Sequence, residues 1–243
     1  MTAREMHYDF KQKLNKIDSQ KYRNLLVPEI DWKLNEAEEV FVKAIAEPRI
    51  KNGFGFETGQ RTIDDIRTLV VNQSIASSNC LAVTQIDSNT YYVTLPSDYW
   101  FHVSSKVYAD KGTCTMKVLN TIIRQHDDRF EVSPFDKSSF EWREVNVRFY
   151  EDRIKIFTDG TFTPKFLCLD YIKKPRLIHN AQDYQGGTYT TLTGVVLTGQ
   201  QSSELPEGTD REIVDLAVLI TAGDLQNPVS DIQTKQNKIN LTK

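Results

Sequence analysis

Apolar side chains near the start of the chain recur at the spacing of a helix. Residues 4–18 carry such a stripe at steps of four, four and three, formed by Met6, Phe10, Leu14 and Ile17. A second helix is predicted from Pro28 to the residues before Pro48, with its stripe at Ile30, Leu34, Ala37, Phe41, Ala44 and Ile45. Thr62, followed by two aspartates, predicts the cap of a short third helix that ends near Leu69.

From about residue 80 to residue 178 the apolar period changes to two, which is typical of strands. The alternation and the turn residues between segments predict strands over 81–86, 91–95, 101–109, 114–123, 145–150, 154–157 and 166–172. Parallel crossovers need a dozen or more intervening residues, so strands this close together predict an antiparallel sandwich or small barrel.

The last quarter of the chain contains three different kinds of segment. Residues 186–200 are rich in threonine, punctuated by glycine and free of charge, and they lack strict alternation, which predicts a projecting hairpin. Residues 210–225 predict a helix with one apolar face, formed by Ile213, Leu216, Ala217, Ile220 and Leu225. The polar tail, 229–243, is expected to order only against a partner.

Together these elements predict an α+β fold. N-terminal and C-terminal helices pack with a central antiparallel β-sandwich or small barrel, and a projecting hairpin and a C-terminal arm are added to them. The predicted parts are an N-terminal helical part, a β-rich part, the hairpin, a C-terminal helix that packs on the N-terminal helices, and the arm. Their boundaries are 1–75, 76–182, 183–204, 205–228 and 229–243.

Charge and hydropathy narrow the range of partners. A length of 243 residues allows a sizeable core, and a net charge of −3 provides no electrostatic footprint for tight binding to a phosphate backbone, although a local basic patch remains possible. No apolar run approaches the roughly 18 residues that a membrane span needs, and the first residues lead into a charged helix, so we expect the protein to be cytoplasmic at synthesis.

The three cysteines predict no disulfide framework. Cys80, Cys114 and Cys168 are odd in number and widely spaced, and two of them lie at strand positions where a small apolar side chain fits. We therefore expect reduced thiols in the core and a reducing compartment.

Tests for catalytic and metal chemistry find no compact site. The four histidines, His7, His102, His126 and His179, lie far apart, which leaves open only a metal site assembled from distant segments. There is no G-x-S-x-G elbow. The glycines of residues 53–59 depart from both phosphate-loop patterns, since no lysine follows them and a helix precedes them. The sequence therefore predicts no enzyme, no cofactor and no metal.

Two acidic groups in the second helix have ordinary explanations. Glu36, Glu38 and Glu39 are expected to spread over a solvated helix face. The run from Pro28 to Lys33 contains the residue types of a nuclease site, but Glu29 and Asp31 project from one helix and cannot converge on one metal.

An aromatic group leaves an alternative function open. Alternation predicts that most of its members belong to the core, although they would stack on bases if an open sheet face displayed them: Tyr91, Tyr92, Tyr99, Trp100, Phe101 and Tyr108. A β-barrel that binds nucleic acid is thus the alternative to a structural protein. An enzyme whose site is assembled from distant residues is the third hypothesis.

Three segments carry a resemblance to a known family. EIDWKLNEAEEVFV at 29–42, LPSDYW at 95–100 and LPE at 205–207 before IVDLAV at 213–218 resemble, in content and order, virion proteins that form the head-to-tail connector rings of short-tailed bacteriophages. The resemblance is greatest to those of crAss-like phages. It implies a ring, commonly of twelve subunits, that docks beneath the portal and forms part of the channel for the genome.

The resemblance also implies partners and positions. The partners would be other copies of the chain, the portal protein, other neck or tail rings, and genome DNA that passes through the lumen without specific binding; no membrane is implied. The protein would lie in the neck or tail of the virion, and in the host cytoplasm during assembly. The long β-rich middle is a departure from simple adaptors, and it leaves the place of the ring in the stack open.

Two sets of residues are expected to contact neighbours. In the hairpin, the expected subunit interface consists of Thr188, Tyr189, Thr190, Leu192, Val195 and Val196. In the arm that would contact the portal or a neighbouring ring, the residues are Val229, Ile232, Lys235, Lys238, Ile239 and Leu241. A nearly neutral chain lets DNA slide, and a neighbouring subunit can cover an uncharged strand that would promote aggregation of a monomer.

Overall fold

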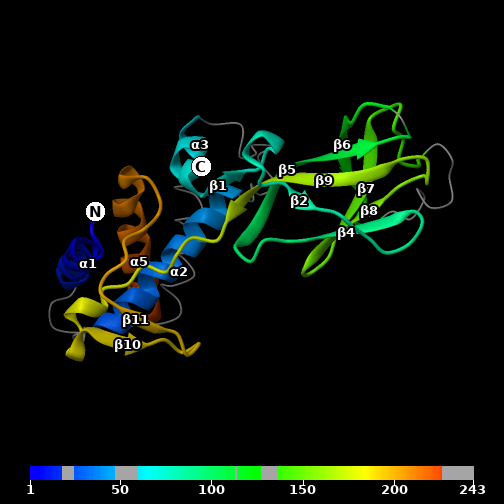
Figure 1. Ribbon diagram of the computed structural model, residues 1–243. Coiled ribbons are helices and arrows are strands. Elements are labelled where there is room, and N and C mark those ends of the chain that lie inside the picture. The colour runs from blue at the N-terminus through cyan, green and yellow to red at the C-terminus, as the bar shows by residue number, and fades with distance from the viewer. Residues whose placement is uncertain (18–24, 47–59, 113, 127–135, 226–243) are drawn as a thin grey trace. The chain divides into compact units, whose positions relative to one another are not determined.

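The chain forms a mixed α+β fold with two compact units, residues 1–69 with 175–243 and residues 70–174. The computed structural model describes residues 1–17, 25–46, 60–112, 114–126 and 136–225 (Figure 1). The loop at 51–59 and the whole predicted arm at 229–243 lie outside the described residues. No described helix is both long enough and apolar enough to span a membrane.

The first unit is built on helices. They are α1 (Ala3–Ile17), α2 (Val27–Ala46), α3 (Gln60–Ile66), which continues as a short 3-10 turn to Leu69, and α5 (Asp210–Leu225). Helix α5 packs against both α1 and α2. The stripe predicted for α1 is buried at Met6, Phe10 and Leu14, as the spacing requires. Helix α3 begins two residues before Thr62, so this threonine is not its cap.

The stripes predicted for α2 and α5 are partly wrong. In α2 the buried residues are Ile30, Asp31, Leu34, Ala37, Glu38 and Val42, whereas Ala44 is exposed and Phe41 and Ile45 are half-buried. In α5 Leu216 and Ile220 are half-buried, while Val214 and Val218 are buried. Partners on several sides widen the buried face of each helix beyond a single apolar stripe.

The second unit is one curled, nine-stranded sheet that forms a half-barrel. Its strands run in the order β1-β9-β5-β6-β7-β8-β4-β3, and β2 pairs with β9. Their bounds are β1 Val70–Asn72, β2 Leu81–Ala82, β3 Thr84–Gln85, β4 Thr90–Thr94, β5 Tyr99–Asp110, β6 Lys117–Ile123, β7 Glu144–Phe149, β8 Arg153–Phe157 and β9 Thr163–Lys173. Apolar side chains that alternate along the strands fill its core, including Val107, Leu119, Val145, Val147, Ile154, Ile156, Leu167 and Leu169.

One strand pair contradicts the antiparallel prediction. Strands β6 and β7 are parallel, with Asn120 beside Glu144 and Ile123 beside Val147. The chain between them runs from 124 to 143, which is long enough for a crossover. The other described pairs of this sheet are antiparallel, and they include β5–β6 and β7–β8, each formed by two predicted strands that follow one another along the chain.

Residues 81–85 form a short connecting segment in the sheet. Leu81 and Ala82 pair with β9, whereas Thr84 and Gln85 pair with β4. The predicted strand 81–86 is thus divided between two partners, because Val83 interrupts it.

The cysteine prediction is wrong. Cys80 and Cys168 form a disulfide with their Cα atoms 4.5 Å apart, and Cys114 is an exposed free thiol. Leu81 pairs with Leu167 in the antiparallel register, so Cys80 and Cys168 are the next pair along β2 and β9. Partners 88 residues apart cannot be matched from spacing alone.

Within 183–204 the structure contains a small hairpin. Strand β10 (Thr188–Thr190) pairs antiparallel with β11 (Val196–Thr198) in the first unit. The connecting turn is closed by the Thr191 N–H, which donates to the Val195 carbonyl at 2.9 Å. Gly194 has a φ of 83°, a left-handed angle that glycine adopts without strain.

Candidate functional site

Three polar side chains on one face of α2 hold distant parts of the first unit. Asp31, Asn35 and Glu38 follow one another at helical spacing, and the two carboxylates are buried. We call these three residues the α2 clamp. The expectation that Glu38 is solvated is therefore wrong, because segments far away in the sequence cover this face.

Asp31 accepts hydrogen bonds from three directions. His7 of α1 lies with Nε2 at 2.7 Å from Oδ1, and the Tyr189 hydroxyl of β10 donates to Oδ2 at 2.6 Å. The backbone N–H of Asn180 lies 3.2 Å from both carboxylate oxygens. Burial, and then the hydrogen bond to this carboxylate, raises the pKa of Tyr189 far above its usual value, so the hydroxyl keeps the proton that it donates.

Asn35 binds the backbone just before the hairpin. Its Nδ2 donates to the Ile178 carbonyl at 2.7 Å, and its Oδ1 accepts from the Ile178 N–H at 2.8 Å. One amide side chain thus satisfies both polar groups of a buried residue in the way that a neighbouring strand would.

Glu38 binds the segment just after the hairpin. The Ser203 hydroxyl donates to its Oε1 at 2.6 Å. Burial, opposed by the Ser203 hydrogen bond and aided by the nearby carboxylates of Glu204 and Asp210, raises the pKa of Glu38 to about 7. A carboxyl group of this kind favours its neutral form inside the folded chain.

The clamp therefore fixes both ends of the hairpin at its base. His179 and Gln201 exchange two backbone hydrogen bonds, at 3.0 and 2.8 Å, and the Gln182 N–H donates to the Gly199 carbonyl at 2.8 Å. The incoming segment is held by Asp31 and Asn35, and the returning segment by Glu38. Both segments are thus held by buried polar contacts, and satisfied polar networks of this kind make a fold rigid.

The end of the hairpin is apolar and exposed. Leu192 is 88% exposed, and Val195 and Val196 are each more than half exposed; we call these three residues the hairpin tip. Residues 184–203 contain no charged side chain. Large apolar side chains displayed together without charges are typical of a surface that binds another protein.

The predicted interface residues fall into two groups. Thr188, Thr190, Leu192, Val195 and Val196 are exposed. Tyr189 is half-buried and directs its hydroxyl to Asp31, which makes it an anchor of the hairpin. The arm residues from Val229 to Leu241 lie outside the described residues.

The clamp was missed at the sequence level although it left a signal. Asp31 and Glu38 are seven residues apart, so they share a helix face and border the predicted stripe at Leu34. Polar residues beside an apolar stripe indicate buried polar contacts. The pattern of apolar and polar residues does not say which segment supplies the partner. The contacts of His7 and Asn180 depend on tertiary packing, and no sequence signal identifies them.

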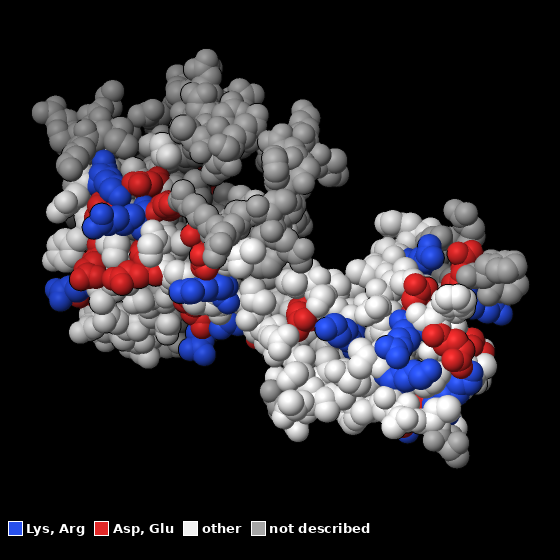
Figure 2. All heavy atoms as spheres, turned by 90° about the horizontal axis from the view of Figure 1, so that it is seen from above, with Lys and Arg blue, Asp and Glu red and all other residues white. Residues whose placement is uncertain are grey.

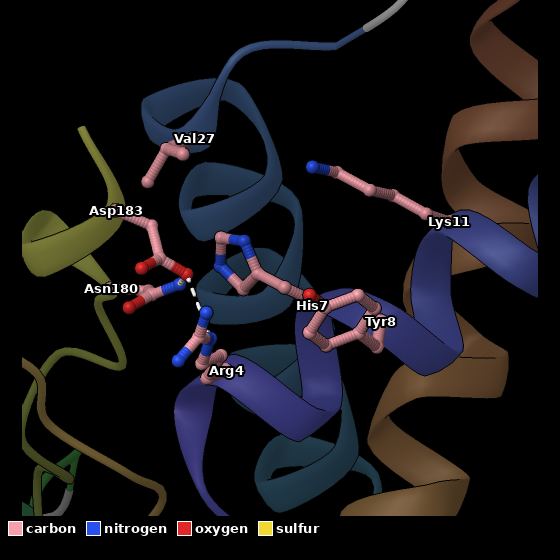
Figure 3. Close-up of a pocket in the computed structure, with 7 residues that line it drawn as sticks. All are labelled: Arg4, His7, Tyr8, Lys11, Val27, Asn180 and Asp183. Atoms are coloured by element: carbon pink, nitrogen blue, oxygen red, sulfur yellow. Dashed lines mark hydrogen bonds and ion pairs between the residues drawn. The ribbon is translucent and has the colours of Figure 1, made fainter. Parts of the chain in front are cut away.

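A cavity of about 140 Å³ lies beside the clamp (Figure 3). It is lined by Arg4, His7, Tyr8, Lys11, Val27, Asn180 and Asp183. Asp183 is engaged by Arg4, whose Nε lies 3.3 Å from Oδ2, and by the Asn180 side-chain amide at 2.9 Å. His7 of the lining pairs with Asp31, which lies outside the lining, and the lining contains no serine, threonine or cysteine that could act as a nucleophile.

Within the described part of the chain, no group of three or more His, Cys, Asp and Glu side chains is arranged to hold a metal ion. The sequence matches no protein-family model, and it matches no curated protein.

Proposed function

We propose that the protein is a virion structural protein that assembles with its own copies into a ring of a phage head-to-tail connector. The ring lies below the portal and forms part of the DNA channel. The observation that carries the proposal is the hairpin tip, an apolar and uncharged surface held in place by a buried clamp. The resemblance of segments 29–42, 95–100 and 205–218 to connector proteins supplies the kind of assembly.

The clamp favours a role in binding because it lowers the cost of association. A hairpin that is already ordered loses little conformational entropy when a neighbour covers it. Burial of a leucine or valine side chain contributes about 1.5 to 3 kcal/mol, so the tip contributes on the order of 5 kcal/mol before the costs of association. A contact of this size is weak by itself, and it suits a ring because the same contact is repeated between all neighbouring subunits.

Charge agrees with passage of DNA. On the face seen in Figure 2, Lys and Arg side chains are interspersed with Asp and Glu in both units. A surface without a large basic field holds DNA weakly, because each phosphate that is neutralised adds affinity. In this proposal the sheet of the second unit closes into a small barrel through residues 81–85, the hairpin projects toward a neighbouring subunit, and residues 229–243 act as the arm.

The mass of the purified full-length chain tests this proposal. Sedimentation equilibrium over a range of concentrations is expected to show a closed oligomer for the wild type. Leu192→Asp is expected to weaken association at least tenfold, because a charge at the tip must be desolvated. Leu26→Asp, at another exposed leucine of the same unit, is the control and should leave the mass unchanged. A wild type that stays monomeric throughout would contradict the proposal.

A specific observation favours nucleic-acid binding as a second candidate. On the outer side of the sheet Tyr92, Lys155 and Arg148 lie directly opposite one another on β4, β8 and β7. The Arg153 guanidinium lies 5.7 Å from the Tyr92 ring centre, and the Lys155 ammonium lies 4.8 Å from that of Tyr150. Of the six aromatics that were mostly expected in the core, Tyr91 alone is buried and the other five are half-buried.

Binding of a single-stranded oligonucleotide at several salt concentrations separates this candidate from the first. A nucleic-acid-binding protein would show a steep loss of affinity with salt, and Lys155→Gln would reduce that slope. A connector that lets DNA slide would show weak binding that Lys155→Gln hardly changes.

A further inference from the structure

An exposed row of apolar side chains crosses four strands on the outer side of the second unit. Ala82 of β2 is directly opposite Phe166 of β9, Phe166 is opposite Tyr108 of β5, and Tyr108 is opposite Val118 of β6. We call these four residues the apolar row. Phe166 is 42% exposed and Val118 is 38% exposed.

The row points away from the core, and the fold does not require it. Its neighbours along the strands, Val107, Leu119 and Leu167, point inward and are buried. The outward side of a half-solvated antiparallel sheet normally carries polar residues. Across β3, β8 and β7 the corresponding outward positions follow that rule, with Thr84, Lys155 and Arg148, and Tyr92 of β4 is the one aromatic residue among them.

The row and the hairpin tip match in size and in charge. Neighbouring strands are about 4.8 Å apart, so a row across four strands spans about 15 Å, enough for the end of a two-stranded hairpin. Charged side chains on β5 lie beyond the row, at Lys106 and Asp110. A charged partner would have to desolvate its charges against this surface, whereas residues 184–203 have none.

We infer that the hairpin tip of one copy docks on the apolar row of the next copy. This inference rests on the proposed function and identifies the two surfaces that form its subunit contact. Because the tip belongs to the first unit and the row to the second, each copy offers two different surfaces, and the contact is heterologous. Contacts of this kind generate rings when the rotation between copies closes.

Mixing two defective variants tests the pairing. Leu192→Lys disrupts the tip and Phe166→Lys disrupts the row, and the two lysines repel each other, so the altered surfaces cannot pair with one another. Each variant alone is expected to form no closed oligomer, because its association is at least tenfold weaker than that of the wild type. Together they retain one intact tip and one intact row, so the mixture should form a 1:1 pair and nothing larger in native mass measurement.

Further variants keep the test decisive. Val118→Lys changes the row from a different strand, and it replaces Phe166→Lys if that variant unfolds, as judged by its thermal transition. Thr94→Lys, at an exposed outward position of β4, is the control and should assemble like the wild type. Assembly that survives both row variants, or a mixture that stays monomeric while the wild type assembles, overturns the docking inference and leaves the proposed function standing. A wild type that never assembles overturns both.

Discussion

At the scale of single residues, the buried carboxylates of α2 determine how the hairpin is held. Asp31 and Glu38 are both buried, but Asp31 has three donors from distant segments, whereas one hydroxyl donates to Glu38. Glu38 has one donor to offset the cost of burial, so its neutral form is favoured. Mutation of Tyr189 therefore tests the contact at Asp31, and Glu38 predicts a dependence of stability on pH.

Replacing Tyr189 tests the anchor at Asp31. Tyr189→Phe removes a hydrogen bond to a buried carboxylate, which should lower the free energy of unfolding by about 2 kcal/mol. Amide hydrogen exchange over 188–198 should become faster, because the hairpin base loses one of its attachments. Tyr184→Phe is the matched control, since Tyr184 packs edge-on against the Tyr189 ring. Equal effects of the two changes would show that the hydroxyl is not an anchor.

Glu38 predicts an unusual pH dependence. Its pKa is about 7 in the folded chain and near 4.5 in the unfolded chain. The contribution of protonated Glu38 to the free energy of unfolding is therefore fully present below about pH 4.5 and is lost as the pH rises to about 7. At 1.36 kcal/mol per pH unit the loss is about 3 kcal/mol. Urea denaturation from pH 5 to pH 8 measures the free energy of unfolding as a function of pH. Glu38→Gln should reduce its dependence on pH, whereas Glu39→Gln, at an exposed position, should not. Identical slopes for the wild type and Glu38→Gln would contradict this account.

At the scale of elements, periodicity predicted the regular segments and failed where tertiary pairing decides. Helices α1, α2 and α5 and the hairpins β5–β6 and β7–β8 are confirmed, because local apolar spacing determines such elements. The parallel pair β6–β7 and the short strand β1 were missed, since each depends on a partner distant in sequence. The hairpin tip was predicted from composition, whereas the clamp that orients it required the packing of α1, α2 and the 178–203 segment.

The disulfide between β2 and β9 yields a prediction for the second unit. Closing a loop of 88 residues stabilises a protein by about 4.6 kcal/mol in the chain-entropy model. The double variant Cys80→Ser/Cys168→Ser should therefore unfold at lower urea concentration than the oxidised wild type, and reduction of the wild type should have the same effect. Cys114→Ser is the control, because this thiol is exposed and unbonded. A wild type whose stability does not change on reduction would show that the bond is absent or neutral.

At the scale of the whole molecule, two exposed apolar surfaces distinguish the chain, and we propose that other copies of it cover them. The hairpin tip and the apolar row both expose large apolar side chains. The uncharged run 184–203, by contrast, is connected to helices whose apolar side chains are buried. Composition could predict a nearly neutral protein. It could not predict the apolar row, because Phe166, Tyr108 and Val118 come together only through the pairing of three strands.

Electron microscopy of negatively stained full-length protein, wild type beside Leu192→Asp, tests the central claim most directly. The account predicts closed rings of uniform diameter for the wild type and single particles for the variant, while both unfold at similar temperatures. Solitary wild-type particles at every concentration, or rings that persist in Leu192→Asp, would contradict it.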